Sequence, residues 1–121
     1  MKIGLLAKRS GKSVHTLRYY EAQRLMPTVT RDAGGRRVYT DLHLSWLDLL
    51  DCLRQSGMSI ADMRVFTALV SEGDTTVRRR RLFLRAHRER VALKVRDLER
   101  CLAHIDRKLV WYDRCVKTKG D

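Results

Sequence analysis

Apolar residues recur at helical spacing over five segments of the chain. The first begins at Ile3 and ends at the sequence SGKS, where Gly11 supplies a turn and Ser13 the N-cap of a second helix. The third and fourth segments cover residues 41–56 and 59–73, with Gly57 between them. This pattern predicts a helix, a tight turn and a second helix, followed further along by a helix pair.

The stretch between the second and third helices has a different pattern. Pro27 closes the second helix, and two short segments, TVTR and RRVYT, then flank the sequence DAGG. Glycine in a short connection between two extended segments is typical of a β-hairpin. The sequence therefore predicts a wing next to the helix-turn-helix.

The fifth segment follows GDTT and runs for about 40 residues without Gly or Pro. Its apolar residues alternate at spacings of four and three, which is the pattern of a coiled-coil seam on a helix about 60 Å long. A helix folded back over the head would show a wider apolar stripe, so the pattern favours pairing with a second chain. We expect a winged helix-turn-helix head over residues 1–72 and a dimerisation helix with a short tail over residues 73–121. The predicted seam consists of Val91, Val95, Leu98, Leu102, Ile105, Leu109 and Tyr112.

Charge narrows the class of partner. The 121 residues carry a formal net charge of +12, with a pI near 10.4. Nine Lys and Arg residues stand against two acids in residues 1–40, so the basic charge is densest in the predicted head. A surface of this kind attracts polyanions, nucleic acid first and anionic membrane second.

The cysteines and the start of the chain indicate the compartment. Cys52, Cys101 and Cys115 are odd in number and widely spaced, which argues against a disulfide framework and for a reducing environment. The first apolar run is too short for a secretory signal, and no segment approaches the length of a membrane span. We expect a cytoplasmic protein.

The outward face of the second helix and the wing carry side chains suited to DNA. A short helix of this size enters the major groove, where polar side chains near its start face base edges and Arg and Tyr reach phosphate. The hairpin tip supplies a second group of arginines beside the groove, and Tyr20 divides its ring between this face and the core. The predicted DNA-binding residues are His15, Thr16, Arg18, Tyr19, Tyr20, Arg36, Arg37 and Tyr39.

These segments together resemble a known family. The sequence IGLLAKRSGKSVHTLRYYEAQRLMP, then GGRRVYT, then LRQSGMSIADM and a terminal coiled-coil helix are similar to the MerR family of winged helix-turn-helix regulators. Arg36 departs from the pattern, because many members have an aromatic residue there. The resemblance implies a mainly α fold and a homodimer joined by an antiparallel coiled coil. It also implies binding to a pseudo-palindromic promoter operator, distortion of that DNA, and action on RNA polymerase.

The residues leave more than one class of effector open. Cys101 and Cys115 are fourteen residues apart, about 21 Å along one helix, which is too far for both to bind one ion. We therefore predict neither a metal site nor a cofactor. A metal-responsive regulator stays open as the alternative, because a second chain could supply further ligands. Cys52, in LLDCLRQSGMS, resembles the sensing cysteine of the branch that responds to aldehydes and other thiol-reactive compounds. The alternative for Cys52 is a small buried hydrophobe.

Two other classes of protein stay open at this stage. An architectural or RNA-binding coiled-coil protein shares the charge and the long helix, but it needs no wing and binds without sequence preference. An enzyme needs a convergent acid, base or nucleophile set, and the four histidines are spread over three predicted helices with no phosphate loop or metal spacing. We therefore expect a regulator rather than an enzyme.

Overall fold

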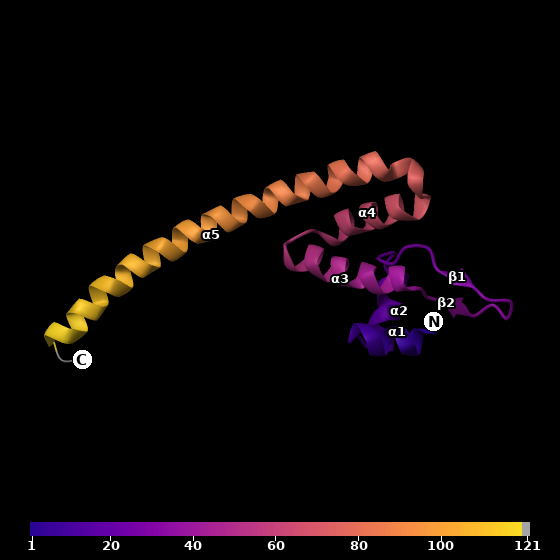
Figure 1. The fold of residues 1–121 in the computed structure, drawn as a ribbon, viewed down its shortest axis with the longest axis horizontal. Coiled ribbons are helices and arrows are strands. Elements are labelled where there is room, and N and C mark those ends of the chain that lie inside the picture. Colours follow the sequence, from indigo (N-terminus) through magenta and orange to yellow (C-terminus); the bar gives the residue numbers. More distant parts are fainter. Residues whose placement is uncertain (120–121) are drawn as a thin grey trace. The chain divides into compact units, whose positions relative to one another are not determined.

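The computed structural model describes residues 1–119 and is mainly helical (Figure 1). Its elements are α1 (Ile3–Ser10), α2 (Val14–Ala22), β1 (Thr30–Arg31), β2 (Arg37–Val38), α3 (Asp41–Gln55), α4 (Ile60–Glu72), the short 3-10 turn η1 (Asp74–Thr76) and α5 (Val77–Lys119). The predicted winged helix-turn-helix head and long carboxy-terminal helix are confirmed. The antiparallel coiled coil concerns two chains and stays a prediction.

The chain divides into two compact units, Met1–Arg85 and the residues from Ala86 onward. The first unit extends past the boundary expected at residue 72, because the start of α5 packs on the head. The Phe83 ring stacks on Phe66 with centroids 5.8 Å apart, and Leu84 also packs against the core.

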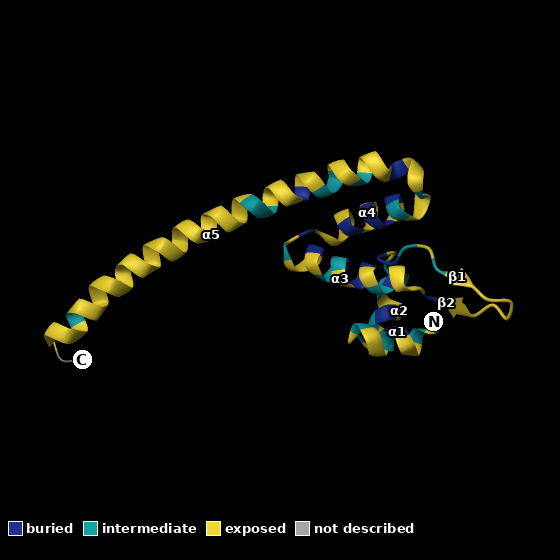
Figure 2. Cartoon of the chain, in the orientation of Figure 1, coloured by how far each residue is buried: buried dark blue, intermediate teal, exposed yellow. Residues whose placement is uncertain are grey.

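The core of the head collects apolar side chains from all four of its complete helices (Figure 2). Helix α1 packs on α2 and α3, and α3 packs on α4. Trp46 joins two parts of this core. Its ring stacks on Phe66 at 5.6 Å, and its indole Nε1–H donates a hydrogen bond to the Leu25 carbonyl at 2.7 Å. A buried Trp whose N–H is satisfied contributes its full apolar area without an unpaired donor.

The helix starts follow the predicted capping chemistry. The Ser13 hydroxyl accepts the Thr16 N–H at 3.0 Å at the start of α2, and the Ser59 hydroxyl accepts the Asp62 N–H at 3.1 Å at the start of α4. Gly11 adopts φ +73°, the left-handed conformation that the tight turn requires. These contacts confirm the predicted N-caps and the predicted turn.

The end of α2 has a feature that sequence reasoning missed. The Leu25 N–H donates to the Tyr20 carbonyl at 2.8 Å and the Arg24 N–H to the Glu21 carbonyl at 3.0 Å, the hydrogen-bond pattern of a Schellman motif. Such a motif needs one residue in the left-handed region, usually Gly, and Arg24 occupies it here with φ +60°. A side chain at this φ is strained.

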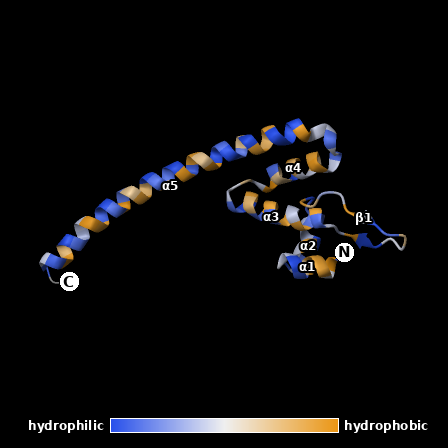
Figure 3. Cartoon of the chain, viewed as in Figure 1, coloured by the Kyte–Doolittle hydropathy of each residue, from blue (hydrophilic) through white to orange (hydrophobic). Residues whose placement is uncertain are grey.

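The second unit consists of α5 from Ala86 onward. Polar and apolar residues alternate along this helix (Figure 3). The predicted seam residues are exposed in the single chain, with Leu98 at 69% and Leu102 at 59%, except for the half-buried Val91. None of the helices within residues 1–119 combines the length and the apolar composition that crossing a bilayer requires.

Candidate nucleic-acid interface

The outward face of α2 presents three of the predicted DNA-binding side chains to solvent. His15, Arg18 and Tyr19 are exposed, with Tyr19 at 50%. Thr16 is half-buried, and its hydroxyl accepts a hydrogen bond from Ser13 Oγ at 2.9 Å. Tyr20 is half-buried and packs against the core, so its ring serves the packing of the head as the sequence suggested.

The wing is a two-residue ladder closed by a turn that Asp32 organises. Its strands pair antiparallel, with Arg31 opposite Arg37. Asp32 Oδ1 accepts the N–H groups of Gly34 at 3.0 Å and Arg36 at 2.9 Å. The Lys2 ammonium binds the other oxygen at 2.6 Å, and this hydrogen bond is the main reason that the pKa of Asp32 lies below its usual value. The turn is therefore held by an ionised carboxylate.

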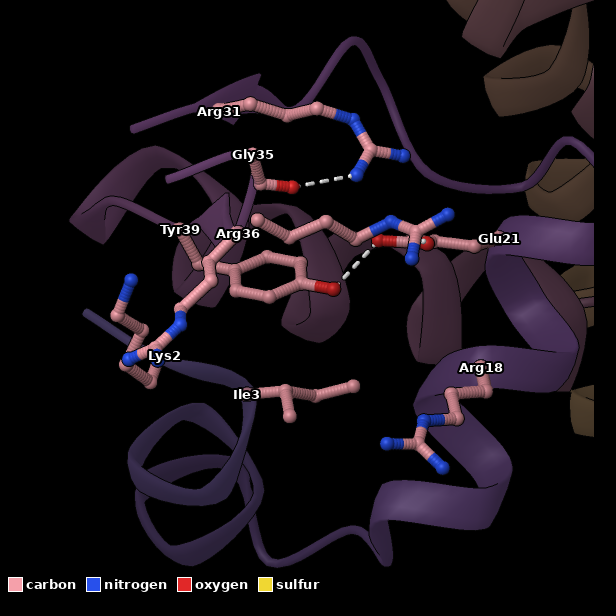
Figure 4. A pocket seen from close by; sticks show the side chains of 9 residues that line it. Lys2, Ile3, Arg18, Glu21, Arg31, Gly35, Arg36 and Tyr39 are labelled. Atoms are coloured by element: carbon pink, nitrogen blue, oxygen red, sulfur yellow. Dashed lines mark hydrogen bonds and ion pairs between the residues drawn. The ribbon is translucent and has the colours of Figure 1, made fainter. Parts of the chain in front are cut away.

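Glu21 fastens the wing to α2 (Figure 4). Its Oε1 accepts the Tyr39 hydroxyl at 2.5 Å, and its Oε2 pairs with Arg37 Nε at 2.8 Å. The Glu21 side chain is only 14% exposed, so the carboxylate is well shielded from water. Burial first, and this hydrogen bond second, raise the pKa of Tyr39, so the phenol stays protonated and donates.

The structure corrects the expectation that Tyr39 reaches phosphate. Tyr39 is 1% exposed and its hydroxyl is bound to Glu21, so in this arrangement it is a core residue that positions the wing. Arg37 is half exposed and has Glu21 as its partner. Sequence reasoning assigned both side chains to DNA because it did not identify Glu21 as their acceptor, although Glu21 lies within the RYYE element.

A hollow of about 320 Å³ lies between the wing and α2, and its lining combines several cationic side chains with the Glu21 carboxylate. Arg18 from α2 and Arg36 from the wing lie on opposite sides of it in Figure 4. Within residues 1–119, neither side chain makes a hydrogen bond or an ion pair, so both guanidinium groups are available. Two such groups flanking one hollow suit the phosphates of a DNA strand.

Sequence reasoning missed two further cations beside the wing. Lys2, from the segment before α1, and Arg31, from β1, line the same hollow. Arg31 Nη1 donates to the Gly35 carbonyl at 2.8 Å, which orders the hairpin tip. The only signal in the sequence was the excess of basic residues near the amino terminus, which does not single out Lys2 or Arg31 from the other basic residues.

The structure contradicts one of the two expectations for Cys52. Cys52 is exposed on α3, so it is not a buried hydrophobe in the single chain. Its neighbour Asp51 holds the turn before α2, since Lys12 Nζ donates to both Asp51 oxygens at 2.9 and 2.7 Å. The Lys12 side chain is 15% exposed, so this ion pair is largely shielded. A direct connection thus joins the residue beside Cys52 to the helix-turn-helix.

Cys101 and Cys115 lie on α5, fourteen residues apart as expected. Within residues 1–119 of the single chain, no group of three or more His, Cys, Asp or Glu side chains is placed to hold a metal ion.

Comparison with known proteins agrees with this geometry. The family model for MerR HTH family regulatory proteins matches residues 1–69. An uncharacterised HTH-type transcriptional regulator of Haemophilus influenzae is 36% identical over 108 residues, which cover 89% of this chain and 80% of that protein. The HTH-type transcriptional regulator AdhR of Bacillus subtilis is 38% identical over 91 residues, which cover 75% of this chain and 65% of AdhR. The crystal structure of HiNmlR, a MerR family regulator lacking the sensor domain and bound to promoter DNA, superposes with a TM-score of 0.80. It is 34% identical and covers 99% of this chain and 94% of HiNmlR.

Proposed function

This chain belongs to the MerR family of helix-turn-helix regulatory proteins and is a DNA-binding transcriptional regulator rather than an enzyme, and on that basis we propose that it binds a pseudo-palindromic promoter operator as a homodimer. Each head reads one half-site, with α2 in the major groove and the wing on the adjacent phosphates. The dimer distorts the DNA between the half-sites and so changes how RNA polymerase uses the promoter, in the cytoplasm.

The observation that carries this proposal is the attachment of the wing to α2 through Glu21. Arg37 and Tyr39 both end on the Glu21 carboxylate, so the wing and the reading helix move as one surface. A surface fixed in this way grips two parts of the DNA backbone at a set separation, and contacts at two half-sites then offset the cost of bending the DNA between them. HiNmlR, which is bound to promoter DNA, has the same fold and supports this arrangement.

The test is selection of bound sequences from a random duplex pool, followed by measurement of affinity for the selected and random DNA at moderate salt. We expect a two-fold symmetric sequence bound at least about a thousandfold more tightly than random DNA. Arg36→Ala should weaken binding to both kinds of DNA, because Arg36 contacts phosphate in this proposal. Arg90→Ala, an exposed arginine on α5, is the matched control and should leave the affinity unchanged. Equal affinity for selected and random DNA would exclude the operator-binding function.

We further propose that Cys52 senses thiol-reactive electrophiles, including aldehydes. Its exposure allows a reagent to reach the thiol, and the neighbouring Asp51 is bound to Lys12 in the turn before α2. An adduct on Cys52 changes the volume and polarity beside this ion pair. The altered position of Lys12 then changes how α2 meets the operator.

This sensing role is tested by transcription from the selected operator with and without an aldehyde. The response should disappear in Cys52→Ser and persist in Cys101→Ser and Cys115→Ser. A wild-type response from Cys52→Ser excludes the sensor. If only a variant of Cys101 or Cys115 stops responding, the sensing site lies on α5 and a metal-responsive regulator becomes the better hypothesis.

A further inference from the structure

One row of residues on α5 changes the sign of its charge along the helix. It contains the residue directly after each of the seam residues Val91, Leu98, Ile105 and Tyr112. It also contains the residues that continue this seven-residue spacing back to the start of α5. We call these positions the flank row, because in a coiled coil they border the apolar seam. The flank row consists of Arg78, Arg85, Ala92, Glu99, Asp106 and Asp113. It is basic in its first third and acidic in its second half.

The acids of the flank row differ from the other acids of α5. Glu89 pairs with Arg88 at 3.0 Å, and Asp97 pairs with Arg100, both within the chain. Within residues 1–119, the flank-row acids make no hydrogen bond or ion pair, and all of them are exposed. Arg78 and Arg85 are likewise exposed and make none in the same range. Among the residues that the structure describes, the row is therefore a set of charges of opposite sign without partners.

We propose that this row sets the direction and register of the dimer, by pairing Arg78 with the partner's Asp113 and Arg85 with the partner's Asp106. The inference rests on the proposed homodimer and specifies its interface. A row that is basic at one end and acidic at the other complements itself only when the second copy runs in the opposite direction. The centre of this pairing lies between Ala92 and Glu99, and each ion pair occurs twice in the symmetric dimer.

The same register brings apolar seam residues together. With Arg85 opposite the partner's Asp106, Val95 lies within two residues, about 3 Å along the helix, of the level of the partner's Leu98. Val91 lies at the same offset from the partner's Leu102. The exposed apolar side chains of the seam are thereby covered at the centre of the interface, where their burial contributes most.

Other arrangements of the two helices leave like charges together. Moving the centre toward residue 99 places Glu99 against the partner's Glu99. A parallel pair brings Arg85 beside the partner's Arg80. Like charges at close positions weaken an interface and suppress the wrong pairing, so the row acts against these alternatives as well as for its own.

Charge reversal with rescue tests this register. Arg85→Glu or Asp106→Arg alone should raise the dimer dissociation constant about tenfold at low salt, since each places like charges together twice. The double variant R85E/D106R restores opposite charges and should return within about twofold of the wild type. R85E/D113R pairs the wrong positions and should stay weak. Each dissociation constant is measured by sedimentation equilibrium of the full chain.

The matched control for Arg85→Glu is Arg90→Glu, which makes the same change of net charge at an exposed position outside the row. The chain carries +12, so lowering its charge by itself relieves repulsion between the two copies and should not weaken the dimer. At 1 M salt, where screening acts over about 3 Å, the difference between R85E and wild type should shrink to about twofold. These results together support the register.

Failure of the register and failure of the dimer give different results. If the wild-type chain sediments as a monomer, the proposed dimer fails and the register fails with it. If the wild type is a dimer but R85E/D106R is as weak as the single variants, the register is wrong while the dimer stands. Rescue by R85E/D113R instead also refutes the proposed pairing, because it identifies a different one.

Discussion

Removing one oxygen atom, in Tyr39→Phe, separates the structural role of the wing tyrosine from a role in binding DNA. Tyr39 is 1% exposed and donates its hydroxyl to Glu21 Oε1 at 2.5 Å. The phenylalanine ring fills the same space, so the substitution leaves the packing intact. Only the hydrogen bond to the carboxylate disappears.

The size of the effect follows from the charge and burial of the acceptor. A hydrogen bond to a charged group contributes about 1.5–3 kcal/mol. Glu21 is 14% exposed and keeps Arg37 at 2.8 Å, so its carboxylate is not left without a partner. We therefore expect Tyr39→Phe to lower the free energy of unfolding by about 1.5 kcal/mol at pH 7, near the lower limit of that range.

The same contact predicts a pH dependence at alkaline pH. Burial and the hydrogen bond to Glu21 raise the pKa of Tyr39 above its ordinary value of about 10, so the unfolded chain releases this proton at a lower pH than the folded chain. The stabilisation is complete below about pH 10 and decreases as the pH rises beyond it. The difference in stability between wild type and Tyr39→Phe should therefore shrink above about pH 10.

Urea unfolding followed by circular dichroism, at one fixed protein concentration, measures both effects. Tyr19→Phe is the matched control. Tyr19 is 50% exposed, so its substitution should change stability by less than about 0.5 kcal/mol while reducing affinity for DNA. The reasoning is refuted if Tyr39→Phe is as stable as wild type at pH 7, or if its stability falls above about pH 10 as steeply as that of the wild type.

Other predictions address the DNA contacts, the interface and the end of α2. Arg18→Ala should weaken binding to all DNA sequences and lower the slope of log affinity against log salt by about 0.9 for each phosphate that Arg18 neutralises; an unchanged slope in a salt titration contradicts the assigned role of Arg18. Leu102→Asp places a charge in the seam and should give a monomer or a poorly folded chain, because burying an unpaired charge costs several kcal/mol; sedimentation of a well-folded dimer contradicts the seam. Arg24→Gly relieves the strain at φ +60° and should raise the free energy of unfolding, measured by urea unfolding, by about 0.5–1 kcal/mol. A decrease in stability would mean that contacts of the Arg24 side chain stabilise the fold by more than the strain destabilises it.

The sequence by itself determined the elements and their order. Helices are local structures, so the spacing of apolar residues, the caps at Ser13 and Ser59 and the turn at Gly11 sufficed to predict them. The seam on α5 was equally visible, because a repeat of seven residues is a property of the sequence alone. The resemblance to MerR regulators rested on the same local segments, and the family match confirmed it.

Only the tertiary structure decided which of the predicted DNA-binding side chains are exposed and which are paired. The sequence suggests that Tyr39 and Arg37 are free to contact DNA, but in the structure both side chains bind the carboxylate of Glu21, which lies on α2. Lys12 and Asp51 are 39 positions apart in sequence, and no local pattern marks them as an ion pair. Exposure and pairing depend on which distant segments pack together, and that is settled by burial of the whole core rather than by any short stretch. The exposure of Cys52 on α3 was likewise decided by packing, because its helix turns other residues toward the core.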